Sequence, residues 1–146
     1  MVDELDTKIL QQLTKNARQS YRQIARKLRV STGTVLTRIR RLEEMGIIRG
    51  YTIMLDTEKL GYQLTALSEL VVSKGKLLEM EREIARLSPV CAVYDITGTT
   101  DAIVIAKFHN REELGNFTKS LLAMPFVERT NTHLVLTTVK EDFRTL

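Results

Sequence analysis

The sequence has a single cysteine and no apolar segment long enough to cross a membrane. Cys91 cannot form a disulfide within the chain, which predicts a reducing compartment, the cytoplasm. A membrane span needs about 18 consecutive apolar residues, and the sequence has no such run, so we expect no membrane partner. The opening residues, MVDELDTK, carry acids where a secretory signal would have an apolar core. The hydrophobic fraction of 43% and the charged fraction of 27% are typical of a soluble globular protein.

Residues that would support catalysis are also scarce. The only histidines, His109 and His133, have no cysteine or acidic cluster near them at the spacing of metal ligands. Cys91 lies in an apolar run, where an inert buried thiol is more common than a nucleophile. The sequence contains no P-loop, no G-x-G-x-x-G and no G-x-S-x-G motif. We therefore predict no enzymatic activity, no metal site and no cofactor.

Charge is divided unevenly along the chain. Residues 1–50 contain 11 lysines and arginines against 5 acids, whereas residues 51–146 contain 11 against 13. A basic amino-terminal third followed by a slightly acidic remainder is typical of a polyanion-binding module joined to a second unit. We expect a DNA-binding domain over residues 1–50, a strand and hinge linker over 51–63, and a second domain over 64–146.

Capping residues and apolar spacing predict helices in the first 50 residues. Residues 3–15 carry apolar side chains at helical spacing, which predicts one amphipathic helix. Ser20 and Gln23 have the spacing of a capping box and begin a second helix. Ser31 is placed to cap a third, and Gly46 to end it. Two short helices joined so closely form a helix-turn-helix (HTH).

The third predicted helix, residues 32–45, has small residues at its start and arginines further along. Val35, Ile39 and Leu42 share one face, which we expect to be buried. A helix of this kind can enter the major groove with its amino end. Arginines on a helix usually form only a solvated surface, but here they coincide with capped helices and a basic domain. The predicted contacts with double-stranded DNA are Arg22, Ser31, Thr32, Gly33, Thr34, Thr37, Arg38, Arg40 and Arg41.

Beyond Gly46, the residues favour strand and then turn. Residues 47–55 are rich in β-branched and aromatic side chains, which predicts a strand leaving the DNA-binding domain. Residues 56–62, which include Gly61, are predicted to form the hinge.

The remaining chain repeats a strand-helix-strand order, with Pro89 and Pro125 in equivalent places. The predicted strands are 64–72, 90–97, 102–108 and 127–138, and the predicted helices are 76–87 and 111–124. This βαββαβ order predicts an α+β chain with a ferredoxin-like second domain. Such a two-layer domain leaves one sheet face open, so we predict a homodimer packed sheet to sheet. A dimer would also match a palindromic operator.

The sequence resembles the Lrp/AsnC family, the leucine-responsive or feast/famine transcriptional regulators, over nearly its whole length. The matching residues are Leu5-Asp6, Ile9-Leu10, Ile24-Ala25, Val30-Ser31, Thr34-Val35, Arg38-Ile39, Leu42-Glu43, Gly46-Ile47-Ile48, Gly50-Tyr51, Gly98 and Asp101. The resemblance implies a winged-type HTH domain, a hinge, and a βαββαβ domain for dimerisation and effector binding. It also implies assembly into octameric rings of four dimers and regulation of amino-acid metabolism.

The resemblance places an amino-acid effector near a G-x-x-D turn. That turn is Gly98, Thr99, Thr100 and Asp101, and the facing strand offers Thr130, Asn131 and Thr132. Asp101 can accept hydrogen bonds from an ammonium, while hydroxyls and the amides around Gly98 meet a carboxylate. The alternative is an ordinary hairpin turn, in which Gly98 allows a positive φ and Asp101 caps the backbone.

Two other functions fit parts of the sequence. The first is an effector-independent DNA-binding or architectural protein, because some members of the family respond to no known effector. RNA binding through the open sheet is the second alternative. The predicted strands hold few aromatic residues for stacking, and their domain is net negative, which disfavours RNA.

Overall fold

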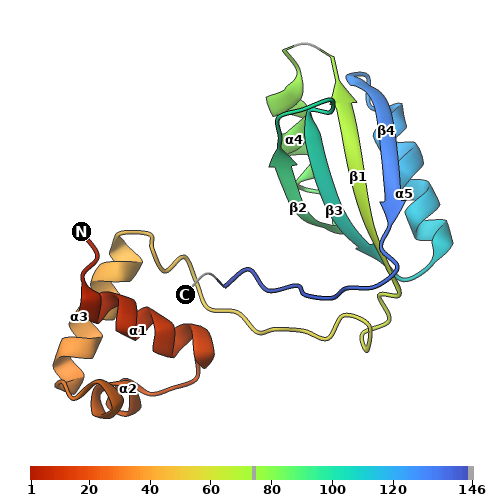
Figure 1. Cartoon of the computed structure of the whole chain (residues 1–146). Coiled ribbons are helices and arrows are strands. Elements are labelled where there is room, and N and C mark those ends of the chain that lie inside the picture. Colours follow the sequence, from red (N-terminus) through yellow and green to blue (C-terminus); the bar gives the residue numbers. More distant parts are fainter. Residues whose placement is uncertain (74, 145–146) are drawn as a thin grey trace. The chain divides into compact units, whose positions relative to one another are not determined.

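The computed structural model describes residues 1–73 and 75–144 (Figure 1). These residues form two compact units. The first contains Met1–Met54 together with the described residues from Lys140 onward, and the second is Leu55–Val139. The break after Met54 falls inside the linker predicted over residues 51–63. The return of the last residues to the first unit is a feature that the sequence pattern does not indicate.

Helices make up the regular structure of the first unit (Figure 1). They are α1 (Glu4–Lys15), α2 (Tyr21–Leu28) and α3 (Thr32–Glu44). The predicted capping box is present, since the Gln23 amide donates to Ser20 Oγ at 3.2 Å and the Ser20 amide donates to Gln23 Oε1 at 2.8 Å. Ser31 Oγ likewise accepts from the Thr34 amide at 3.0 Å. Both predicted caps are therefore confirmed.

One apolar cluster joins the three helices. Val35, Ile39 and Leu42 of α3 are fully buried, as predicted. Val35 and Ile39 pack with Ile9 and Ile24 from the other two helices. Burying side chains of this size supplies the main driving force for folding a unit this small. The cluster fixes which face of α3 points inward, and so which residues it presents outward.

The strand predicted over residues 47–55 is wrong. The structure assigns no strand to any of these residues, which are all described. Tyr51, Ile53 and Met54 are 53%, 74% and 69% exposed, so most of their surface remains open to solvent. β-propensity reflects the fit of a side chain to a pleated, half-buried surface, and the chain offers residues 47–55 no such surface. The predicted hinge is a turn in which the Gly61 amide donates to the Glu58 carbonyl at 2.9 Å.

The second unit has the predicted βαββαβ order (Figure 1). Its elements are β1 (Leu64–Val72), α4 (Leu77–Ile84), β2 (Val90–Asp95), β3 (Ala102–Phe108), α5 (Arg111–Ala123) and β4 (Val127–Leu134). The strands form an antiparallel sheet in the order β2-β3-β1-β4, with both helices on one side. The ferredoxin-like arrangement is therefore confirmed.

Two strands end earlier than predicted. β4 stops at Leu134, which pairs with Ala66 near the start of β1, so residues 135–138 have almost no partner strand left. β2 stops at Asp95 because the next amide, that of Ile96, donates to the Asp101 carbonyl and closes a turn. In both cases the strand ends where its neighbouring strand ends, and the β-propensity of the following residues does not extend it.

The sheet has a buried face and an open face. Ala66, Leu70 and Phe108 point toward the helices and pack with Met80 and Leu121 in the core of this unit. The alternate residues of β1 and β3 point to the other face, where they are only partly buried. They include Leu67, Val71, Ile103 and Ile105.

Candidate functional site

The outer surface of α3 carries most of the predicted DNA contacts. Ser31, Thr32, Gly33, Thr37 and Arg40 are exposed, and Arg22 is exposed on α2. Thr34, Arg38 and Arg41 are partly buried. The structure therefore brings most of the predicted residues together on one helix, but their side chains are not equally exposed to solvent.

Asp6 of α1 is a fully buried carboxylate that α3 encloses. Arg38 Nη1 donates to Asp6 Oδ1 at 3.1 Å, and Arg41 Nη2 donates to Asp6 Oδ2. Arg38 also donates to Asp3, whose backbone amide donates to Asp6 Oδ2 at 3.0 Å. These four residues, Asp3, Asp6, Arg38 and Arg41, form an ion-pair cluster between α1 and α3, which we call the α1–α3 clasp.

The clasp changes the electrostatics of its members. The hydrogen bond from Arg38, followed by that from the Asp6 amide, lowers the pKa of Asp3 to about 2. The same contact, with the one to Asp6, raises the pKa of Arg38. Two of the arginines predicted to contact DNA, Arg38 and Arg41, therefore have their positive charges paired with carboxylates of the protein.

Other basic residues keep an uncompensated charge. Arg22 and Arg40 are exposed, and neither makes an ion pair within the described part of the chain. The first half of α3 presents the exposed residues Thr32, Gly33 and Thr37, which have short side chains. Short residues near a helix amino end, together with exposed arginines, form the kind of surface that fits a DNA groove.

The predicted effector turn has a structural role. Gly98 has φ +133°, a backbone conformation that favours glycine. Asp101 Oδ2 accepts from the Val72 amide at 2.8 Å, and the Asp101 amide donates to the Leu70 carbonyl at 2.8 Å. The carboxylate thus ties the turn to the end of β1, as the hairpin alternative expected.

The predicted effector residues of β4 point to different faces of the sheet. Thr132 Oγ1 lies 3.0 Å from Ser68 Oγ on the helix side. Asn131 points to the open face, where its Nδ2 lies 3.3 Å from Glu69 Oε2 and 3.0 Å from His133 Nε2.

Thr130 pairs with Leu70 of β1, whose other neighbour is Ala102 of β3. One strand therefore separates Thr130 from the turn that ends at Asp101. The predicted effector residues lie at one end of the sheet, but they do not line a single face in one chain.

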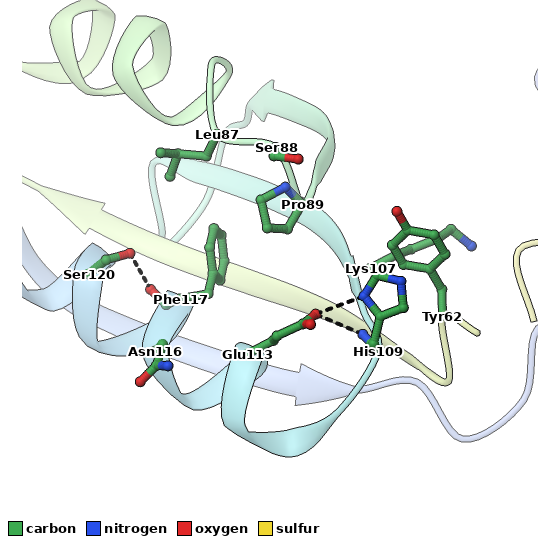
Figure 2. A pocket seen from close by; sticks show the side chains of 10 residues that line it. All are labelled: Tyr62, Leu87, Ser88, Pro89, Lys107, His109, Glu113, Asn116, Phe117 and Ser120. Carbon is green, nitrogen blue, oxygen red and sulfur yellow. Dashed lines mark hydrogen bonds and ion pairs between the residues drawn. The ribbon is translucent and has the colours of Figure 1, made fainter. Parts of the chain in front are cut away.

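A cavity of about 530 Å³ lies at the other end of β3, in a place the sequence does not indicate (Figure 2). It is formed by Tyr62, residues 87–89, Lys107, His109, and one side of α5. His109 Nδ1 lies 3.1 Å from Glu113 Oε2, and the His109 and Tyr62 rings stack with centroids 4.1 Å apart. No sequence motif connects His109 with Tyr62, so the sequence does not predict this contact.

Neither a metal cluster nor a membrane span is found in the described chain. Across residues 1–73 and 75–144, no three histidine, cysteine or acidic side chains lie where they could share a metal ion. None of the helices in these ranges has the length and hydropathy of a membrane span.

Together, a capped HTH with a basic surface and a ferredoxin-like α+β unit define a DNA-binding protein with a separate second domain. Family models agree with this class. A winged helix-turn-helix DNA-binding model matches residues 2–49, and the Lrp/AsnC ligand binding domain matches residues 65–145. The chain belongs to the Lrp/AsnC family of transcriptional regulators.

Individual relatives cover almost the whole chain. An uncharacterized HTH-type transcriptional regulator of Pyrococcus furiosus is 52% identical over 98% of this chain and 97% of its own. The HTH-type transcriptional regulator FL11 of Pyrococcus horikoshii is 36% identical over 96% and 93%. The transcriptional regulator NMB0573 of Neisseria meningitidis, solved as a complex with L-Met, is 26% identical, with a TM-score of 0.89 over 98% and 95%. These relatives are named as regulators, which supports the prediction that the chain is not an enzyme.

Proposed function

We propose that this regulator binds a palindromic double-stranded DNA operator, with the amino end of α3 in the major groove. The observation that carries the proposal is the exposed set Thr32, Gly33 and Thr37 on the same helix as Arg40, which makes no ion pair within the described residues. Small side chains let the helix approach base edges closely, and the arginine reaches phosphate or guanine.

The predicted contact residues have four different roles. Arg22 and Arg40 contact the DNA backbone or guanine edges, and Thr32, Gly33 and Thr37 face the bases. Ser31 caps α3, and its Oγ lies 2.8 Å from Thr34 Oγ1, so both stand at the edge of the interface. Arg38 and Arg41 hold α3 against α1 through the clasp, and they thereby fix the orientation of the α3 residues that face the DNA.

The open sheet face is the proposed homodimer interface. Leu67, Val71, Ile103 and Ile105 form an apolar strip there that is only partly covered in one chain. A twofold contact between two such faces gives a dimer that carries two copies of α3, and four such dimers form the octamer. Ile105→Glu is expected to give monomers in light scattering, while Lys119→Glu, on the exposed part of α5, is expected to leave the dimer intact. A dimeric I105E variant contradicts this interface.

The second unit is proposed to bind an amino acid near the Gly98–Asp101 turn and to adjust transcription of genes of amino-acid metabolism in the cytoplasm. The L-Met complex of NMB0573, a protein of the same fold, supports an amino acid as effector. Thr99 and Thr100 offer hydroxyls, and the Asp101 carboxylate faces the end of β1.

One experiment tests DNA binding and the effector together. Genomic fragments are selected by the full-length protein with and without each of the amino acids, and the bound sites are footprinted. We expect enrichment of palindromic duplex sites, and a change in their occupancy with at least one amino acid. Preference for single-stranded RNA contradicts the proposed function, and palindromic sites that ignore every amino acid support the effector-independent alternative.

A further inference from the structure

The cavity beside His109 is separate from the predicted effector turn. The turn precedes the first residue of β3, Ala102, and His109 follows its last, Phe108. At about 3.3 Å per residue, the strand places the two sites roughly 20 Å apart. The volume of about 530 Å³ lies within the range of small-molecule sites in proteins.

The walls of this cavity are mainly apolar (Figure 2). Leu87 and Pro89, from the segment between α4 and β2, face Phe117 of α5 across the cavity. Phe117 is only 6% exposed, so its ring is part of the core and is held in place. These walls suit an apolar group such as an aromatic ring or a branched alkyl chain.

The end of the cavity carries a carboxylate in a fixed position. Glu113 Oε2 accepts from the His109 amide at 2.9 Å and lies 3.1 Å from His109 Nδ1. Both contacts use the same oxygen, and Glu113 Oε1 makes no hydrogen bond within the described residues. The bonds from His109, that of the amide first, lower the pKa of Glu113, so the group stays ionised at neutral pH.

The remaining charged side chain at the cavity points elsewhere. Figure 2 shows the Lys107 side chain passing behind the Tyr62 ring, with its ammonium directed away from Glu113. The Tyr62 ring stacks on His109 at 4.1 Å and so limits the positions that the imidazole and its bound carboxylate can take. The polar end of the cavity is therefore anionic.

We propose that this cavity binds a small primary amine with an apolar body. The ammonium pairs with Glu113 Oε1, and the apolar body lies between Phe117 and the Leu87–Pro89 wall. An ion pair with a charge-assisted hydrogen bond is the strongest polar contact such a site can make. Because Tyr62 lies two residues before β1, an occupant also touches the point where the chain from the first unit enters the sheet.

The test uses three probes of one shape and different charge on the full-length protein. These are 2-phenylethylamine, 2-phenylethanol and 3-phenylpropionate, titrated while amide signals are followed by nuclear magnetic resonance. We expect saturable shifts near Glu113 and Phe117 with the amine, and at least tenfold weaker binding of the alcohol and the acid. Absence of saturable shifts, or an alcohol that binds as tightly as the amine, overturns the proposal.

Variants of neighbouring carboxylates locate the contact. Glu113→Gln keeps an oxygen for the His109 amide but removes the charge, so it is expected to weaken amine binding at least tenfold. Glu112→Gln, at the adjacent exposed position of α5, is the matched control and is expected to bind as the wild type does. Asp101→Asn is likewise expected to leave amine binding unchanged. Equal loss in E112Q and E113Q, or loss in the Asp101 variant alone, contradicts this site.

Discussion

Arg41 of α3 donates to Asp6 of α1, and the Asp6 side chain has no solvent exposure, whereas that of Arg41 is 42% exposed. The contact joins the helix proposed to read DNA to the first helix of the chain. A buried carboxylate has to be paired, because an unpaired charge in the protein interior is unfavourable by several kcal/mol. The position of α3 therefore depends on residues that do not face the DNA.

Removing the buried charge is expected to destabilise the first unit. Asp6→Asn loses both arginine ion pairs, and we expect the free energy of unfolding to fall by about 3 kcal/mol, measured by urea denaturation. Glu4→Gln is the control, because Glu4 pairs with Lys8 on the surface and its side chain is 83% exposed. An Asp6 variant as stable as the Glu4 variant would contradict the proposed role of the clasp.

The salt dependence of DNA binding separates clasp arginines from DNA-contacting arginines. Each phosphate contact contributes about 0.9 to the slope of log K against log salt concentration. Arg40→Gln is expected to lower that slope by about 1 per bound protomer, and Arg41→Gln to weaken binding with the slope unchanged. Equal slope changes in the two variants would assign both side chains to phosphate.

Acid should weaken the clasp over a defined pH range. The pKa of Asp3 is about 2 in the folded protein and 3.8 as a free side chain, so its contribution to stability is present above pH 3.8 and is lost toward pH 2. Asp3→Asn keeps a side-chain oxygen for the helix cap but cannot ionise. The melting temperature of the wild type should exceed that of D3N at pH 7, and the difference should disappear near pH 2. A difference that is constant with pH would exclude this carboxylate as the cause.

Asp101 has a structural contact that complicates its use as an effector probe. Asp101→Ala leaves the Val72 amide without its acceptor, so we expect the second unit to lose about 1–2 kcal/mol of stability. Asp101→Asn keeps an acceptor oxygen and is expected to retain most of this stability while losing any pairing with an ammonium. The measurements are thermal unfolding and the amino-acid response of DNA binding. If the Ala variant is as stable as the wild type, the bond to Val72 is not significant.

Local patterns predicted most of the first unit. Ser20 and Ser31 act on backbone amides three residues away, so their roles follow from spacing alone. The clasp was not predicted, because Arg41 and Asp6 are 35 residues apart. One signal was available, since Asp6 lies three residues before the buried Ile9 and so falls on the apolar side of α1.

The second unit was predictable in order but not in its details. Repeated strand-helix-strand spacing predicts βαββαβ, whereas the ends of β2 and β4 depend on the strands beside them. The cavity depends on Tyr62, Pro89 and Glu113 meeting through the fold, and no spacing in the sequence brings them together. Residues 47–55 have β-propensity but no partner strand among the described residues, and propensity alone cannot supply one.

The last described residues rejoin the first unit, where Arg144 Nη1 donates to the Thr14 carbonyl at 3.1 Å. In topological terms, the second unit is an insertion within the DNA-binding unit. Domains generally fold in the order in which they are synthesised, so the helices of residues 1–54 can pack before the sheet exists. The contact from Arg144 to Thr14, by contrast, can form only after the residues of the second unit have been synthesised.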